Sequence, residues 1–253
     1  MKALKYIIFA SLCLAGLASC EKKEPTQDEI EAKWPTSITT AEAGDFVLVY
    51  RPQEGYSMGD NSLSSSTVKN AKLSKSFYMC TKEVTQAQWV AVMGSNPSDN
   101  EYIKAGANKD NCPVNNITYN DAKAFVKKLN EATGRKYAIP KEEQWEWAAM
   151  GGKLSSGFIY SGSNNSAEVA WSAVDYEATL NEVAQLKPNE LGLYDMSGNI
   201  AEWTSSANSI RGGHYESANP EELNVRYNSK TNAESPYFVG LRLIIEEPLS
   251  TDK

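Results

Sequence analysis

Residues 191–203 read Leu191-Gly192-Leu193-Tyr194-Asp195-Met196-Ser197-Gly198-Asn199-Ile200-Ala201-Glu202-Trp203, and this segment constrains the structure of the 253-residue chain more than any other. Gly198 and Asn199 are residue types that readily adopt positive φ, so they predict a tight turn. The segment Arg211-Gly212-Gly213 follows shortly afterwards. We expect Arg211, Arg226 and Arg242 to be buried partners of core carboxylates, the alternative being direct contacts to a ligand.

Shorter motifs surround this segment in a fixed order. They are Glu83-Val84-Thr85 with Gln88-Trp89, Pro113-Val114, Thr118 with Asp121-Ala122, Ile139-Pro140 with Trp145-Glu146, Pro188-Asn189, Arg226 and Gly240-Leu241-Arg242. Each motif is weak alone, but the ordered set spans nearly the whole folded part. It resembles the formylglycine-generating, or sulfatase-modifying-factor, family. The resemblance implies an α+β fold with much irregular structure, a variant of the C-type lectin architecture.

The chemistry of that family depends on two cysteines downstream of Arg-Gly-Gly. Their thiolates hold Cu(I), which activates oxygen to oxidise a substrate cysteine. The resemblance places Ser217 and Glu222 at these positions. Thiolate is a soft ligand that suits Cu(I), whereas hydroxyl and carboxylate oxygens are hard, so copper is not expected. We expect a non-catalytic protein, and the alternative is a formylglycine-generating oxidase that converts a substrate cysteine with an atypical site.

Two sets of residues are candidate binding sites by resemblance. The first is a calcium site, in which the side chains of Asp195 and Glu202 and the carbonyls of Gly198 and Ile200 surround the ion. The alternative is an ordinary tight turn with Glu202 in a buried ion pair. The second set frames the family's cleft and consists of His214, Tyr215, Ser217, Glu222 and Arg226.

The segment from residue 214 to 238 is rich in Asn, Tyr, Ser and Glu, which suit an adaptable binding surface. By resemblance it lies where variable proteins of the same fold carry their binding residues. An envelope protein, a peptide or a glycan is therefore the expected partner. The alternative is a polar surface loop without a partner.

The first residues predict an exported protein. Lys2 and Lys5 precede an apolar run that ends in Leu17-Ala18-Ser19-Cys20, and this run is too short to span a bilayer comfortably. It resembles a bacterial lipobox, which implies a signal peptide over residues 1–19 and a lipidated Cys20. The alternative is an ordinary signal peptide with an incidental cysteine. The charged residues 20–43 predict a solvated tether and resemble the surface-export signals of Bacteroidetes lipoproteins.

Composition excludes several classes of function. The chain has 25 Lys and Arg against 32 Asp and Glu, a net charge of −7, so nucleic acid is not an expected partner. Its single histidine, His214, cannot build a zinc or iron site from histidines. Once Cys13 is cleaved away and Cys20 is lipidated, Cys80 and Cys112 remain. They form either a disulfide or two buried thiols that act as small apolar side chains.

The remaining sequence predicts the elements of one domain over residues 44–247, with a tail at 248–253. Residues 46–51 and 76–84 predict strands, and helices are expected from Thr85 to Gly94, from Thr118 to Gly134 and after Pro140. Residues 154–189 predict loops, and the apolar residues 238–245 predict a strand that closes a sheet. We expect an outer-membrane lipoprotein, displayed on the cell surface, similar to the gliding- or secretion-associated lipoproteins of Bacteroidetes.

Overall fold

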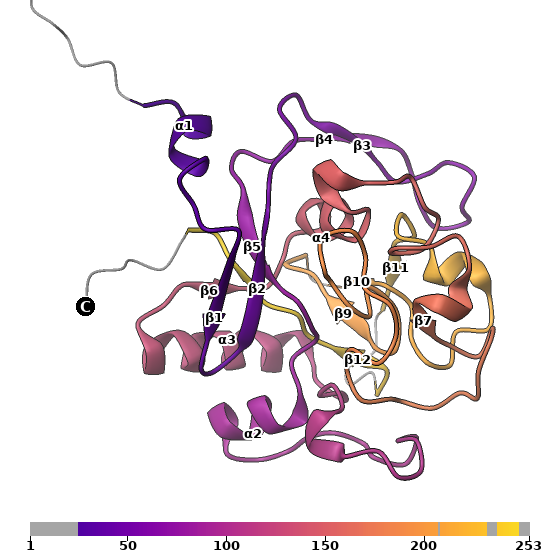
Figure 1. Cartoon of the computed structure of the whole chain (residues 1–253). Coiled ribbons are helices and arrows are strands. Elements are labelled where there is room, and N and C mark those ends of the chain that lie inside the picture. Colours follow the sequence, from indigo (N-terminus) through magenta and orange to yellow (C-terminus); the bar gives the residue numbers. More distant parts are fainter. Residues whose placement is uncertain (1–24, 207, 232–236, 248–253) are drawn as a thin grey trace, which may run out of the picture.

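The computed structural model describes residues 25–206, 208–231 and 237–247 (Figure 1). The expected signal peptide over residues 1–19, the lipidated Cys20 and the tail at 248–253 lie outside these residues. Across the described ranges, no helix has the length and apolar character needed to cross a bilayer.

A five-stranded antiparallel sheet joins the two ends of the domain. Its strands, in spatial order, are β1 (Ser37–Thr40), β2 (Gly44–Val49), β5 (Phe77–Cys80), β13 (Ile244–Ile245) and β6 (Tyr137–Ala138). Both faces of this sheet are buried. Along β2, Phe46 and Leu48 face one apolar cluster, while Val47 and Val49 face another. This burial on two sides explains why apolar residues alternate only weakly with polar ones in the sequence.

Three helices cover the sheet (Figure 1). α2 (Gln86–Met93) and α3 (Tyr119–Thr133) pack on the face of Phe46, with the rings of Trp89 and Phe125 stacked 4.9 Å apart. α4 (Glu142–Ala149) packs on the opposite face through Trp145. The expected start and end signals of α2 and α3 are confirmed. Thr85 and Thr118 form capping boxes, and Gly94 and Gly134 end the helices in the left-handed conformation.

The rest of the domain is irregular, as the sequence predicts. A four-stranded sheet has the order β11 (Ser229–Lys230), β10 (Ser209–Arg211), β9 (Ala201–Trp203) and β12 (Val239–Gly240). Two further strand pairs are β3 (Tyr56–Met58) with β4 (Lys69–Ala71), and β7 (Ala170–Trp171) with β8 (Ser197–Gly198). Single helical turns lie at η1 (Lys109–Asn111), η2 (Gly152–Leu154), η3 (Ser166–Glu168) and η4 (Pro220–Leu223). The fold is mixed α+β.

The expected tether over residues 20–43 is wrong from the first described residue onwards. Residues 25–43 form α1 (Gln27–Glu31) and β1, so the folded domain begins well before residue 44. Glu31 is buried and accepts hydrogen bonds from the backbone N–H and the hydroxyl of Ser76. Trp34 stacks on Tyr78 with ring centroids 5.8 Å apart. The charged composition does not predict this contact, because the partner of the buried Glu31 carboxylate lies 45 residues further along the chain.

The expected strand over residues 238–245 is divided between two sheets. β12 runs parallel to β9, whereas β13 pairs with β5 and β6. Gly240 permits this crossing, since a Cβ atom there would lie 2.6 Å from the carbonyl oxygen of Val114. Arg242 lies between the two strands and is fully buried.

Arg242 and Glu202 form the central ion pair of the domain. Nε and Nη2 of Arg242 donate to the Glu202 carboxylate at 2.7–3.1 Å. Its Nη1 and Nη2 also donate to the carbonyls of Cys80 and Tyr194, at 3.0 and 2.8 Å. Trp145 donates its indole N–H to Glu202 at 2.6 Å. The pair therefore joins β5, β9, α4 and the loop that contains Tyr194.

Replacing Arg242 with Met should destabilise the domain by about 3–5 kcal/mol, because Glu202 would remain buried without its cation. The free energy of unfolding in urea measures this loss. As a control, Lys127→Gln removes an exposed charge on α3 and should cost less than about 0.5 kcal/mol. A loss below about 1 kcal/mol for Arg242→Met would refute the central role of the pair.

Candidate functional site

Two consecutive glycines shape the candidate site at the end of β10. Gly212 and Gly213 have φ of +99° and +71°, in the region that favours glycine. A Cβ atom at Gly213 would lie 2.8 Å from the carbonyl oxygen of Glu222, and one at Gly212 would lie 3.3 Å from the ring of Trp145. The chain can therefore leave the sheet sharply only because both side chains are missing. This turn brings His214 next to the segment of Glu222.

The turn borders a small cavity of about 160 Å³, which we call the glycine-pair pocket. Its walls combine apolar and aromatic side chains with a polar rim. The lining residues are Ala201, Ile210, Gly213, His214, Glu222, Tyr227, Ser229, Lys230, Thr231 and Phe238. Of the five expected cleft residues, the pocket thus brings together His214 and Glu222.

His214 packs into the wall of this pocket in a largely neutral form. Its ring stacks on Phe238 with centroids 4.5 Å apart, and its Nδ1 accepts the backbone N–H of Glu216 at 3.3 Å. Burial of the ring lowers the pKa of His214 to about 4, because a charged imidazolium loses its hydration there. At neutral pH the histidine therefore contributes an uncharged aromatic surface.

Aromatic rings extend from His214 to the molecular surface. Tyr215 is buried beside His214, and Tyr102 lies 5.8 Å from Tyr215 and 5.9 Å from Tyr237, centroid to centroid. Tyr102 and Tyr237 are both exposed. Tyr215, which we expected to frame the cleft, does not line the glycine-pair pocket and instead packs between His214 and Tyr102. Nothing in the sequence placed Tyr102 here, since it lies in an irregular loop more than a hundred residues from Tyr215.

Ser217 and Glu222 lie close to the glycine pair, but neither is a soft metal ligand. The Ser217 hydroxyl accepts the backbone N–H of His214 at 3.1 Å and stabilises the turn. Cys80 and Cys112 do not line the pocket. Both are free and buried, so the disulfide expected as one alternative is wrong and they act as apolar side chains. This donor set does not fit Cu(I).

Arg226 is wrongly expected in the cleft. Its Nη1 donates to the carbonyls of Ser57 and Gly59, at 2.7 and 3.1 Å, and lies 3.8 Å from Glu146. It therefore fastens the second half of the domain to the β3 strand. Arg211 and Arg242 are buried partners of Glu146 and Glu202, which confirms their expected role.

Contacts within the protein already engage the two side chains expected to bind calcium. Both oxygens of Glu202 are engaged by Arg242 and Trp145, and a guanidinium beside the carboxylate opposes a second cation. Asp195 instead accepts the backbone N–H of Ala184 at 2.6 Å. Gly198 and Asn199 have φ of +80° and +57°, as in the tight-turn alternative. Among the described residues, no three His, Cys, Asp or Glu side chains are grouped to hold a metal.

A second cavity lies on the other side of β10 and β11. Alternate residues of these strands face opposite ways, so Ile210 and Ser229 line the glycine-pair pocket while Arg211 and Asn228 line the second cavity. Lys230 borders both. The second cavity has a volume of about 180 Å³, and we call it the lysine pocket. Its remaining walls come from β3, β4, the loop between them and Glu146 of α4.

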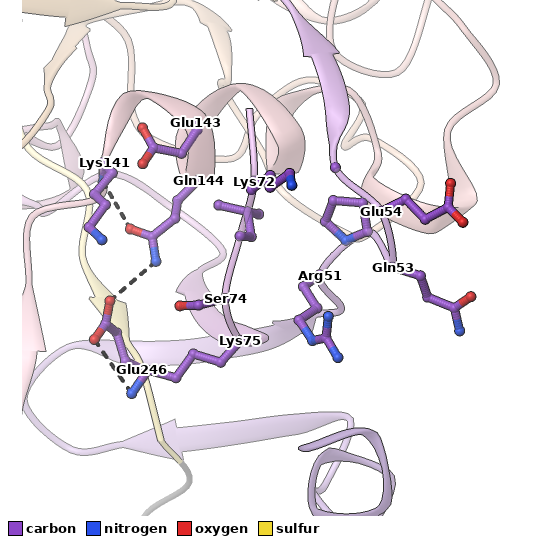
Figure 2. Close-up of a pocket in the computed structure, with 13 residues that line it drawn as sticks. Arg51, Gln53, Glu54, Lys72, Ser74, Lys75, Lys141, Glu143, Gln144 and Glu246 are labelled. Carbon is purple, nitrogen blue, oxygen red and sulfur yellow. Dashed lines mark hydrogen bonds and ion pairs between the residues drawn. The ribbon is translucent and has the colours of Figure 1, made fainter. Parts of the chain in front are cut away.

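Figure 2 shows a larger cleft, of about 550 Å³, beside the N-terminal end of α4. Lys141, Glu143 and Gln144 form one wall, and residues 72–75 form another. Some of its charges are paired within the protein. Arg51 contacts Asp28 at 2.6 Å, and Lys75 contacts Glu246 at 3.8 Å. Because cations and carboxylates are mixed along its walls, we assign no ligand to this cleft.

The chain is similar in sequence and fold to known proteins. A model described as the sulfatase-modifying factor enzyme 1-like domain matches residues 24–247. The chain belongs to this family. Chaperone protein LppX of Paenibacillus barcinonensis is 34% identical over an alignment of 244 residues, covering 79% of this chain and 80% of that protein. The match also places the start of the domain at residue 24, in agreement with the docked α1.

Two further proteins are similar to this chain, one over a shorter part of the sequence and one at a lower identity. The inactive Cα-formylglycine-generating enzyme 2 of Bos taurus is 33% identical over 106 residues, which cover 37% of this chain and 33% of that protein. Treponema denticola variable protein 1 has a TM-score of 0.73 at 23% identity, covering 84% of this chain and all of that one. The structural similarity confirms the expected variant of the C-type lectin fold.

The environment of His214 should make stability depend on pH. Its folded pKa lies below the ordinary value of 6.5, so its contribution is present above pH 6.5 and is lost as the pH falls towards 4. We expect wild-type protein to lose stability relative to His214→Phe between pH 7 and pH 5. Urea unfolding of both proteins at the two pH values measures the difference. Parallel pH dependence in the two proteins would contradict a buried, neutral His214.

Proposed function

We propose that this chain is a non-catalytic, polypeptide-binding lipoprotein of the cell envelope. Residues 1–19 act as its signal peptide, and a lipidated Cys20 anchors it to the outer membrane. The observation that carries the proposal is the glycine-pair pocket, where the family's turn is kept but aromatic and hard polar groups surround it. Ser217 and Glu222 provide no soft ligand pair there for a copper-dependent oxidation.

The size and lining of the pocket favour a side chain as its occupant. Its volume of about 160 Å³ lies below the range of ~300–1,000 Å³ usual for cofactor and drug-sized ligands. Ala201, Ile210 and Phe238 provide an apolar wall, while Ser229 and Lys230 provide a polar rim. Such a pocket can take one apolar or aromatic side chain while the rim hydrogen-bonds to the neighbouring backbone.

The exposed aromatic rings beside the pocket enlarge this surface. Tyr102 and Tyr237 are each more than a third exposed and continue the aromatic group of His214 and Phe238. Rigid aromatic rings give contact area at a low cost in conformational entropy, which suits binding of varied partners. An extended polypeptide can place one side chain in the pocket and lie across the tyrosines.

The similarity to a chaperone supports the same class of partner. LppX is named a chaperone and is similar to this chain over 80% of its own length. A chaperone contacts polypeptide segments that have not yet buried their apolar side chains. We infer that the partner of this chain is such a segment in an exported protein. The anchor at Cys20 would keep the pocket near the site where exported chains fold.

Filling the pocket should weaken polypeptide binding. Ser229→Trp places a large ring in the cavity and should weaken binding of a reduced, alkylated and permanently unfolded polypeptide by about tenfold or more, because about 1.4 kcal/mol of contact is lost. Fluorescence anisotropy of the labelled polypeptide measures this. Lys127→Trp adds the same ring to an exposed position of α3 and should bind like wild type.

Two results would overturn the proposal. One is equal binding by wild type and Ser229→Trp, with thermal unfolding showing that both are folded. The other is a wild-type protein that ignores the unfolded polypeptide but binds oligosaccharides, which would make the aromatic surface a glycan site.

A further inference from the structure

We propose that the lysine pocket binds a tetrahedral oxyanion, a phosphate or sulfate group that is either free or part of an ester. The pocket lies across β10 and β11 from the glycine-pair pocket. This proposal does not depend on polypeptide binding, because Lys230 is the one residue that lines both cavities and all their other lining residues differ. Three cationic side chains line it, namely Lys69, Arg211 and Lys230, against a single lining carboxylate, Glu146.

Arg211 provides an unsatisfied donor in the wall of the pocket. Its side chain is only 1% exposed, and its Nη2 pairs with Glu146 and contacts the carbonyl of Val225 at 3.4 Å. Its Nε is buried and has no acceptor among the described residues. A buried donor without a partner is unfavourable, and a bound anion or an ordered water would satisfy it. The Nε of Arg211 is therefore a buried hydrogen-bond donor that still lacks an acceptor.

The two lysines approach from separate strands. Lys69 lies on β4, is more than half exposed and has its Nζ 3.5 Å from Glu142. Lys230 lies on β11 and forms no ion pair with any described residue. A lysine ammonium can swing on its flexible stem towards an anion, as in many phosphate sites.

Hydroxyl groups complete the rim. The Ser66 hydroxyl accepts the backbone N–H of Asp60 at 3.0 Å, and its own hydrogen has no acceptor in the described part of the chain. Thr67 lies beside it. Gly59 holds this loop close to the pocket, since a Cβ atom there would lie 2.5 Å from the carbonyl oxygen of Thr67. The missing side chain at Gly59 therefore lets the loop that carries these hydroxyl groups lie on the rim of the pocket.

The charge and the arrangement of donors favour a tetrahedral anion. Glu146 is already matched by Arg211 and by Arg226 at 3.8 Å, and Lys69 pairs with Glu142 at 3.5 Å, so Lys230 adds positive potential around the cavity. The donors come from β4, β10, β11 and the serine loop, and so surround the cavity from several directions. A phosphate or sulfate has acceptors in all these directions, whereas a carboxylate presents two oxygens in one plane. A volume of about 180 Å³ accommodates either anion.

A phosphate titration of the intact, folded protein at constant ionic strength tests this site. In two-dimensional NMR spectra, the amide signals of Gly59, Ser66 and Lys230 should shift and saturate with sodium phosphate but not with chloride. Lys230→Gln and Lys69→Gln should each weaken phosphate binding by about tenfold, the factor that 1.4 kcal/mol represents. Lys72→Gln, in the cleft of Figure 2, should bind like wild type.

Comparing the binding of glycerol phosphate with that of inorganic phosphate identifies the form of the anion. Tighter binding of glycerol phosphate than of inorganic phosphate would indicate an ester group carried by a larger molecule, and the reverse order would indicate the free ion. Either order supports the site. Equal responses to phosphate and chloride, or unchanged phosphate binding in Lys230→Gln, would overturn it and leave only water beside Arg211.

Discussion

The buried ion pair of Glu202 and Arg242 is the interaction on which the rest of the structure depends. Removing two charges from water is costly, and the cost is offset only when geometry and hydrogen bonding are nearly complete. Here the carboxylate also accepts the indole N–H of Trp145, and the guanidinium also donates to the carbonyls of Cys80 and Tyr194. These contacts fix β9 against β5 and α4. Since β10 pairs with β9, they also fix the start of the glycine-pair turn.

A second buried pair, Arg211 with Glu146, extends this network to the edge of the candidate site. Neither pair involves Ser217 or Glu222, which lie in the turn and the short helix beyond Gly213. The scaffold is therefore stabilised independently of Ser217 and Glu222. Under the proposed function, this separation lets the fold keep its stability while a binding pocket occupies the turn.

The sequence predicted those parts of the fold that depend on interactions between residues close together in the chain. Thr85, Thr118, Gly94 and Gly134 mark helix ends because capping involves residues a few positions apart. The errors concern long-range partners. Glu31 docks on Ser76, Arg226 reaches the β3 strand, and Tyr102 joins Tyr215 across the domain. For Glu202 the sequence left calcium and an ion pair open, because the choice depends on Arg242, which is forty residues away.

We propose that this scaffold binds a polypeptide without oxidising it. The most direct test supplies the purified protein with Cu(I), oxygen and a cysteine-containing peptide of the sulfatase type, then follows the peptide by mass spectrometry. We expect no conversion of the peptide cysteine to formylglycine, with or without copper. A copper-dependent conversion of the cysteine to formylglycine would contradict it.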